Sequence, residues 1–334
     1  MRCLAEQMHQ FQLRGPGRPA RELLWEVGEY EMYSFLARML RYHNAALHHQ
    51  RMFAGQSRPN FADEVIGYVE KHLEELPPVI QTYFHCHRSC CQAADAGLFQ
   101  IARDHLCRHQ TGFSRIESSE LHVSLLNHAA RQLNQGAGNW LQVVYELYQE
   151  MLELGLLEEQ ERISPWHFKN IVNVGARLGE VAWTTHFMAQ WEDAVAGDYC
   201  HNARNFVQGI LHFHQQEFEA AAMCFHAVLS DYKDVFYGID ARGYLLQIHY
   251  ETGNMRGLEA LAHSFRMYLN RNETLSEEHR LGHLLFINHL SRLISMPLHD
   301  QNRLQSLRSD VLSKATRGMG SRWLLAKIDE RRHS

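Results

Sequence analysis

The 334-residue sequence lacks several features that mark common classes of protein. It holds only seven prolines and seven cysteines, and no stretch approaches the roughly 18 uncharged apolar residues that would span a bilayer. Its first residues have no apolar segment of the kind found in a secretory signal. An odd number of cysteines suits a reducing compartment better than a disulfide framework. These absences predict a cytoplasmic protein without a membrane partner.

Motifs of common active sites are missing too. The segment from His105 to His109 lacks the glutamate that a metalloprotease helix carries between its histidines. Gly136 and Gly138 are followed by Leu141, where a dinucleotide-binding loop needs its third glycine. There is no phosphate loop ending in Gly-Lys-Ser/Thr and no strand–turn–helix serine motif. The sequence therefore predicts a protein that is not an enzyme and binds no cofactor.

The few prolines fall where helices are expected to begin or end. Ser164 followed by Pro165 matches an N-cap residue with proline in the first helical turn. Pro77 and Pro78 separate two helical patterns. Between such positions apolar residues recur every three or four residues, and no long stretch alternates with the period of two that predicts a strand. The sequence predicts helix nearly everywhere from Arg21 to Lys327.

A repeat of about 40 residues organises this helical pattern. The spacings between its five turn positions are 41, 41, 37 and 37 residues. Four glycines and one glutamine occupy these positions: Gly97, Gly138, Gly179, Gln216 and Gly253. One turn and two amphipathic helices per period are typical of stacked helical repeats. We therefore predict an all-α fold, specifically an α-solenoid of antiparallel helix pairs.

Charge and composition suggest three parts. Residues 1–20 are expected to form a flexible segment, residues 21–300 the solenoid, and residues 301–334 closing helices with a basic surface. Between residues 61 and 300 there are 17 Lys or Arg against 30 Asp or Glu, so the body is acidic. The first helices carry the aromatic-rich stretch from Trp25 to Leu40, through which the chain could associate with a second copy.

Histidine is abundant, with 24 residues. With an unperturbed pKa near 6.5, about a quarter of these side chains would be protonated at pH 7. Most are expected to lie on exposed helix surfaces.

The clearest unit of the repeat spans residues 204–229. There Gly209, Phe218, Ala221 and Phe225 have the spacing of the small, aromatic, small and aromatic positions of a tetratricopeptide repeat, which this stretch resembles. The resemblance extends over about residues 95–270 and implies a non-catalytic scaffold for protein–protein interaction. In that family the first helix of each pair lines a concave groove for a peptide or a partner protein.

The resemblance also implies which residues bind the partner. Transferred by spacing, the groove-facing positions of the central units are Lys169, Asn173, Arg177, Phe213, His214, Gln247 and Tyr250. Aromatic and basic side chains of this kind are useful anchors for an extended chain and its carboxylates.

A second interpretation rests on a cluster of cysteine and histidine between residues 85 and 109. Pairs four residues apart project from one face of a helix, as Cys86 with Cys90, His87 with Cys91, and His105 with His109 would do. Antiparallel packing of two such helices could assemble Cys86, Cys90, His105 and His109 into a tetrahedral zinc site. The same cluster could instead contain a redox-active thiol. Either would make the chain a zinc- or thiol-dependent regulatory protein.

Binding of RNA along a helical repeat is a third interpretation. It rests on a basic C-terminal stretch: Arg317, Arg322, Lys327, Arg331 and Arg332. The acidic body opposes the phosphate attraction that supplies most non-specific affinity, so nucleic acid is the weaker expectation.

Overall fold

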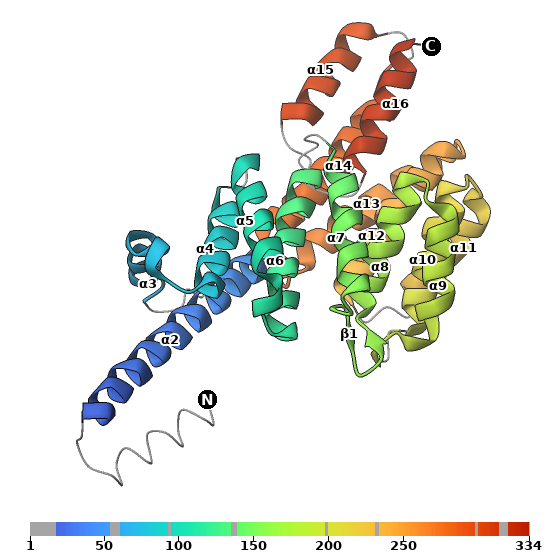
Figure 1. The fold of residues 1–334 in the computed structure, drawn as a ribbon. Coiled ribbons are helices and arrows are strands. Elements are labelled where there is room, and N and C mark those ends of the chain that lie inside the picture. The colour runs from blue at the N-terminus through green and yellow to red at the C-terminus, as the bar shows by residue number, and fades with distance from the viewer. Residues whose placement is uncertain are drawn as a thin grey trace. The chain divides into compact units, whose positions relative to one another are not determined.

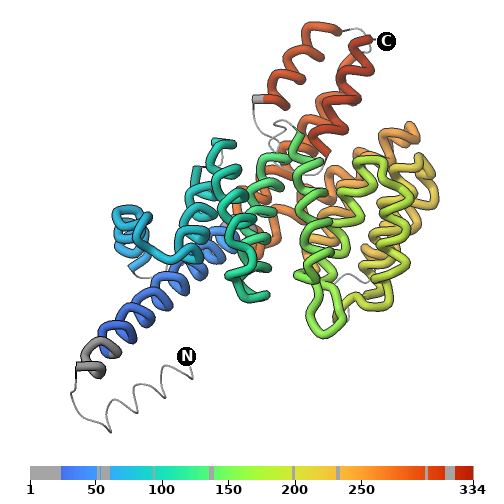
Figure 2. The backbone as a smooth tube through the Cα atoms, in the orientation of Figure 1, coloured from blue at the N-terminus to red at the C-terminus, as the bar shows by residue number. Residues whose placement is uncertain are grey.

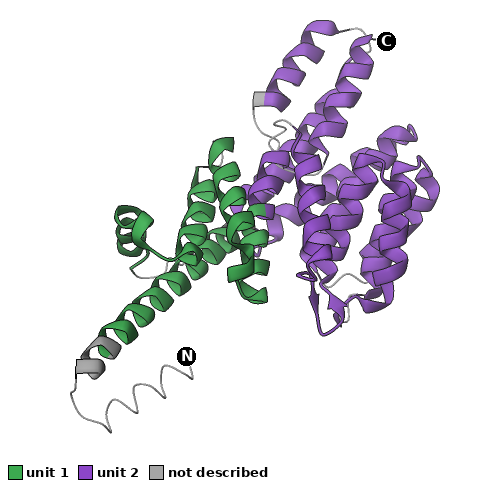
Figure 3. Ribbon diagram, viewed as in Figure 1, with its two compact units in different colours: residues 1–50, 56–125 green, residues 51–55, 126–334 purple. Residues whose placement is uncertain are grey.

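The computed structural model describes residues 18–53, 61–92, 95–134, 139–197, 200–230, 234–297, 300–313 and 320–333. The chain divides into two compact units, coloured separately in Figure 3: unit 1 comprises residues 1–50 and 56–125, and unit 2 comprises residues 51–55 and 126–334. The segment predicted to be flexible, residues 1–20, lies outside the described residues except for its last three, which begin a helix.

Helices form almost all of the described chain (Figures 1 and 2), so the prediction of an all-α fold is confirmed. In the part of the chain that the structure describes, no helix has the length and apolarity needed to cross a membrane. The helices that begin in unit 1 are α2 (Arg18–Met52), α3 (Ala62–Lys71), η1 (Leu73–Glu75), α4 (Pro78–Cys91), α5 (Ala96–His109), η2 (Gln110–Gly112) and α6 (Arg115–Asn134).

In unit 1 the long helix α2 is connected to α4 and α6 through polar side chains. Leu36, Leu40 and His43 of α2 are buried. The hydroxyl of Tyr83 on α4 donates to Glu120 of α6 at 3.1 Å, and the same carboxylate forms an ion pair with Arg41 of α2. Helix α4 also packs on α3 and on α5. Three helices are therefore tied together around one carboxylate.

Unit 2 continues the helical pattern with one short hairpin. Its elements are α7 (Trp140–Glu153), β1 (Glu158–Glu159), β2 (Arg162–Ile163), α8 (Pro165–Leu178), α9 (Val181–Trp191), η3 (Glu192–Ala194), α10 (Cys200–His214), α11 (Phe218–Ser230), α12 (Val235–Glu251), α13 (Met255–Arg271), α14 (Glu277–Ser295), α15 (Gln301–Ser313) and α16 (Ser321–His333). From α10 to α16 each helix packs on the next, and α10 also contacts α8 and α12.

One apolar core joins α12 to α16. It includes fully buried side chains from five consecutive helices: Leu246, Phe265, Ile287, Leu307 and Leu324. The closing helices α15 and α16 therefore belong to the core of unit 2 and do not form a separate layer of surface helices.

Three of the predicted turn positions share one backbone conformation. Gly179, Gln216 and Gly253 have φ angles of 81°, 64° and 68°. At each, the next residue's amide donates to a carbonyl five residues back, as Glu180 does to Gly175 at 3.0 Å. This is the hydrogen bond of a Schellman motif, which ends a helix with a left-handed residue. Gly97 instead lies in the first turn of α5, and Gly138 lies outside the described residues.

Local signals explain where helices begin. The side chain of Ser164 accepts a hydrogen bond from the amide of Trp166 at 3.3 Å, as predicted for an N-cap residue. Asp234 caps α12 in the same way. The hairpin of β1 and β2 was not predicted. It turns at Gln160 and Glu161, whose φ angles of 52° and 62° fit a two-residue type I′ turn; Gln-Glu is not a sequence that predicts this turn.

Candidate functional site

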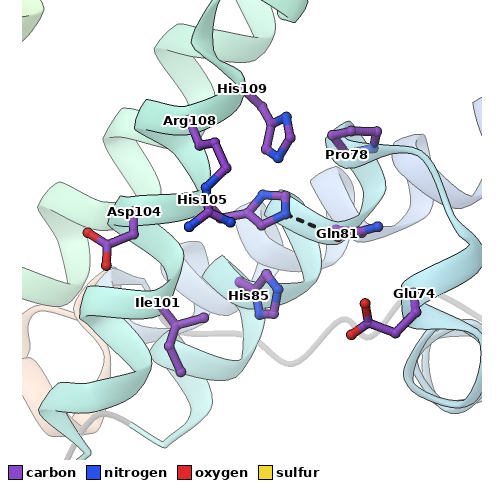
Figure 4. Close-up of a pocket in the computed structure, with 9 residues that line it drawn as sticks. All are labelled: Glu74, Pro78, Gln81, His85, Ile101, Asp104, His105, Arg108 and His109. Atoms are coloured by element: carbon purple, nitrogen blue, oxygen red, sulfur yellow. Dashed lines mark hydrogen bonds between the residues drawn. The ribbon is translucent and has the colours of Figure 1, made fainter.

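Two groups of polar residues stand out, one in each unit. In unit 1 a pocket of about 430 Å³ opens between η1, α4 and α5. Figure 4 shows the imidazole rings of His85, His105 and His109 gathered at its centre. The full set of lining residues is Glu74, Pro78, Gln81, His85, Ile101, Asp104, His105, Arg108 and His109. The ring centroid of His105 lies 5.1 Å from that of His85 and 4.5 Å from that of His109.

Hydrogen bonds hold the central ring of this pocket. Gln81 donates through Nε2 to the carbonyl of Leu76 at 2.7 Å, which turns its Oε1 toward His105 Nε2 at 3.1 Å (Figure 4). The other ring nitrogen, Nδ1, lies 2.7 Å from the hydroxyl oxygen of Thr82. Since Gln81 Oε1 can only accept, His105 donates from Nε2. The Thr82 hydroxyl also lies 2.7 Å from the carbonyl of Pro78, so its one proton is shared between that carbonyl and His105 Nδ1.

Burial and, to a lesser extent, the nearby His85, His109 and Arg108 together lower the pKa of His105 to about 4. The pKa of His85 is lowered as well, first by burial. Both rings are therefore neutral at pH 7. The pocket offers neutral imidazoles, one guanidinium and two carboxylates to a small polar ligand.

Of the four predicted zinc ligands, His105 and His109 line this pocket, whereas Cys86 and Cys90 do not. Cys86 is fully buried, and Cys90 is nearly so, with its thiol 3.8 Å from the carbonyl of Ser124. Burial raises the pKa of the Cys86 thiol, and Cys90 raises it further, which disfavours the thiolate that binds metal. His105 already has both nitrogens engaged. Among the described residues no three His, Cys, Asp or Glu side chains are grouped so that they could hold a metal ion.

A different cysteine of the predicted cluster has a histidine partner. Cys91, exposed at the end of α4, places its Sγ 3.4 Å from His87 Nε2. On the other side of the same ring, Nδ1 lies 3.1 Å from Asn44 Oδ1 of α2. Asn44 Nδ2 donates to the carbonyl of Tyr83 at 3.1 Å, which fixes the direction of the amide. The Cys91 sulfur also lies 3.9 Å from His87 Nδ1, so it stands beside the ring and is not in line with either nitrogen.

In unit 2 the seven predicted partner-binding residues divide by exposure. Three are buried, namely Lys169, Phe213 and Gln247. Gln247 donates to the carbonyl of Gly243 in its own helix at 3.3 Å. Tyr250 is half-buried and packs edge-on against Trp323, with ring centroids 5.3 Å apart. These residues contribute to packing between helices.

Lys169 has an ionic partner inside the unit. Its Nζ lies 2.6 Å from Asp240 of α12, a residue 71 positions away in sequence. The ammonium group also lies over three aromatic rings, at 4.9 Å from the ring centroid of Tyr237, 5.5 Å from Phe206 and 5.7 Å from Trp166. Carboxylate and ring faces both stabilise a cation away from water.

The remaining predicted residues lie where helices α8 and α10 end. Asn173 accepts a hydrogen bond from the hydroxyl of Tyr244 at 2.9 Å. Arg177 is one turn further along α8, and His214 is the last residue of α10. Burial lowers the pKa of Arg177, and the charge of Arg322 on α16 lowers it further. Within the described residues no acidic side chain pairs with Arg177 or His214.

His214 is exposed, yet the surrounding protein desolvates its ring and, with the charge of Arg177, lowers its pKa to about 4. A side chain in a recess of the surface can be exposed to solvent and still be desolvated by the protein around it. Arg177 and Arg322, with His214 beside Arg177, form what we call the cationic surface of unit 2; the two guanidinium groups carry its charge, because the lowered pKa leaves the His214 ring neutral at pH 7. The end of α8 tolerates Arg177 because the last carbonyls of a helix carry partial negative charge.

Sequence reasoning did not find Asp240, Tyr244 or Asn44. Each acts through a partner at least 39 residues away in sequence, so periodicity along one helix gives no signal for it. Arg322 was noted only as part of a basic stretch.

Comparison of the chain with protein-family models, with curated proteins and with solved structures finds no match in any of the three.

Proposed function

We propose that this chain is a non-catalytic scaffold in the cytoplasm whose unit 2 is a tetratricopeptide-like α-solenoid, and that its cationic surface binds an acidic peptide segment of a partner protein. The observation that carries the proposal is that the charges of Arg177 and Arg322 repel each other, beside the neutral ring of His214, without an acidic partner in the described residues. Repulsion between like charges is unfavourable in a half-buried setting. An external carboxylate would relieve that repulsion and accept charge-assisted hydrogen bonds.

The packing of unit 2 supports the solenoid part of the proposal. Helix α10 contacts α8 before it and α12 after it, as expected when each helix pair stacks on its neighbours. The Schellman turns after α8, α10 and α12 recur every 37 residues. At Gly209 a Cβ atom would lie 2.9 Å from the ring of Phe225, so the small and aromatic positions of the resemblance meet at a close helix contact.

The direction of the helices supports the site. In stacked pairs, first helices run parallel, so α8 and α10 would end on the same side of the unit. Arg177 and His214 lie at those ends. Tyr250, at the end of α12, contacts Trp323 of α16, the helix that carries Arg322. The same edge therefore offers aromatic and cationic groups together.

The test is fluorescence anisotropy with a labelled peptide rich in Asp and Glu, compared with a matched peptide carrying Asn and Gln. The acidic peptide should bind more tightly, and its affinity should fall as salt rises. Arg177→Gln should raise the dissociation constant about tenfold, which corresponds to about 1.4 kcal/mol. The exposed Arg271 provides the control, because it lies at the opposite end of α13 from the turn after α12, and Arg271→Gln makes the same change of charge away from the cationic surface.

Equal weakening by Arg177→Gln and Arg271→Gln would show that only net charge matters and would contradict the proposed site. Tighter binding of a single-stranded RNA of equal charge would favour the RNA interpretation instead. Absence of any difference between the acidic and neutral peptides would remove the function proposed here.

A further inference from the structure

Helix α2 carries several large apolar side chains that are exposed. They include Leu24, Phe35, Tyr42 and, with 77% of its surface exposed, Trp25. Single apolar residues are common on a protein surface, whereas a group of them on one element marks an interaction site. In Figure 1 the first turns of α2 extend beyond the other helices of unit 1. This part of α2 therefore has the composition and the accessibility of an interface.

The exposed positions of α2 follow a seven-residue repeat. Beginning at Leu24, alternating steps of four and three residues reach eight positions, and every one of them is exposed: Leu24, Gly28, Glu31, Phe35, Arg38, Tyr42, Ala45 and His49. We call these residues the exposed stripe. The buried Leu36 and Leu40 lie on the other side of the helix. Steps of four and three are the spacing at which two helices pack along each other in a coiled coil.

The stripe is long enough for a helix pair. At 1.5 Å per residue, the part from Leu24 to Tyr42 extends over about 27 Å. Its first, middle and last positions hold large apolar side chains, Leu24, Phe35 and Tyr42. Burial of these side chains against a second helix supplies the favourable free energy of association.

The charges of α2 are divided between its two halves. Residues 22–37 contain four glutamates and no Lys or Arg, whereas residues 38–51 contain three arginines and no Asp or Glu. Within the stripe, Glu31 forms no ion pair with any residue that the structure describes. Arg38 donates to the carbonyl of Ser34 in its own helix at 3.1 Å, and this contact leaves its charge without a carboxylate.

Charge complementarity identifies a second copy of α2, in the antiparallel direction, as the occupant of the stripe. In a parallel pair the two acidic halves would meet and repel each other, as would the two basic halves. In an antiparallel pair each acidic half lies along a basic half. A register that sets Leu24 against Tyr42 of the second copy also sets Gly28 against its Arg38, next to Glu31. The absence of a side chain at Gly28 leaves room for the guanidinium group.

We propose that two copies of this chain associate through the exposed stripes of α2, packed antiparallel, with Glu31 of each copy paired with Arg38 of the other. Each contact occurs twice, as a two-fold axis requires. The apolar residues supply the burial, and the charges determine the direction. The inference concerns unit 1 and is independent of the peptide-binding function proposed for unit 2.

Sedimentation velocity of the full chain between about 1 and 200 µM tests the association. The measured mass should rise with concentration from that of one chain to that of two, because mass action controls a reversible dimer. Phe35→Ser should raise the dissociation constant of the dimer at least tenfold, since it removes apolar surface from the middle of the stripe. Phe35 is exposed in unit 1, so the variant should retain the fold of the single chain, which circular dichroism checks.

Charge variants test the direction of the helices. Glu31→Arg and Arg38→Glu should each raise the dissociation constant about tenfold, because each brings like charges together twice. The variant with both changes restores opposite charges and should return to within about threefold of the wild type. Glu70→Arg is the control. Glu70 is exposed on α3, on the other side of that helix from Tyr68, whose hydroxyl contacts Met32 of α2. This change should leave the association unaltered.

Three results would overturn the proposal. One is a chain that stays monomeric at every concentration, since the stripe is then covered by another protein or by another part of the chain. Another is a dimer that neither Phe35→Ser nor the single charge variants weaken, because it forms through a different surface. The third is a double charge variant that associates as weakly as the single variants, because an antiparallel pair requires its recovery.

Discussion

Gln216 adopts a backbone conformation that is unfavourable for its residue type. Its φ of 64° matches those of Gly179 and Gly253 at the equivalent turns. An L-residue in this region brings Cβ close to the backbone, whereas glycine has no such contact. Glycine, however, loses more conformational entropy on folding. The net difference at Gln216 should therefore be small and favour glycine.

Replacing Gln216 with glycine should stabilise the protein by about 0.5 kcal/mol, and Gly253→Ala should destabilise it by about 1 kcal/mol. A Cβ at Gly253 would meet no atom within 4 Å, so the second change tests backbone conformation alone. Urea unfolding followed by circular dichroism gives both values. A loss of stability in Gln216→Gly would contradict the idea that the turn conformation is strained.

The spacing of the repeat predicted these turns correctly, even at Gln216, because a turn every 37 residues is a property of the chain itself. The surroundings of single side chains were harder to predict. Periodicity places Lys169 on a face of its helix, but whether that face meets solvent or a carboxylate depends on Asp240, which comes 71 residues later. The same holds for His87, whose Nδ1 lies 3.1 Å from Asn44 on another helix, 43 residues away in sequence.

Helix boundaries followed from local signals where these were strong. Both ends of α8 follow from residues that the sequence analysis identified, since Ser164 caps its start and Gly179 ends it. Helix α9 instead ends at Trp191 without such a signal and continues as the 3₁₀ helix η3, after which Val195 bridges to Ile163. That bridge forms with a hairpin no sequence pattern indicated. Pairing of Val195 with the distant Ile163 therefore determines where the helical segment ends.

The ion pair between Lys169 and Asp240 joins helices α8 and α12. Only 7% of the Lys169 side chain and 21% of the Asp240 side chain are exposed. Asp240→Ala would leave the ammonium group without its carboxylate among aromatic rings, which should cost about 3 kcal/mol. Lys169→Met should cost less, because Asp240 retains more solvent. The double variant should be more stable than the sum of the single effects predicts.

Chemical denaturation of the four proteins of this double-mutant cycle measures the coupling. Arg303→Ala is the control, since Arg303 pairs with Asp300 at the surface with 68% of its side chain exposed; it should cost less than about 1 kcal/mol. Additive effects of Lys169→Met and Asp240→Ala would mean that the pair does not hold α8 against α12.

For the whole molecule, the sequence predicted neither the division into two units nor the protonation of the histidines. The helical pattern runs without interruption through α6, yet residues on either side of 125 belong to different units. Composition suggested that about a quarter of the 24 histidines would be charged at pH 7. Several instead have a pKa that desolvation lowers, including His105, His214 and His283, so the folded protein binds fewer protons than expected.

The lowered pKa of histidines in the folded protein predicts how the free energy of unfolding depends on pH. Burial lowers the pKa of His105 in unit 1 and of His283 in unit 2 to about 4, whereas the unfolded chain would have values near 6.5. Between these pH values unfolding takes up protons. The stabilisation from neutral rings is thus fully present above pH 6.5 and is lost as pH falls toward 4. Each such histidine should contribute a slope of about 1.4 kcal/mol per pH unit.

Guanidinium unfolding at several pH values between 7.5 and 4.5 measures this slope. Because His283 is buried, with 4% of its surface exposed, His283→Gln should reduce the slope by the amount that one histidine contributes, even though it lowers stability at pH 7.5. The same change at exposed His263 should leave the slope unaltered, since its ring stays in water in both states. If His283→Gln and His263→Gln share the wild-type slope, acid sensitivity comes from the carboxylates, and neutral buried imidazoles do not determine the pH range in which the fold persists.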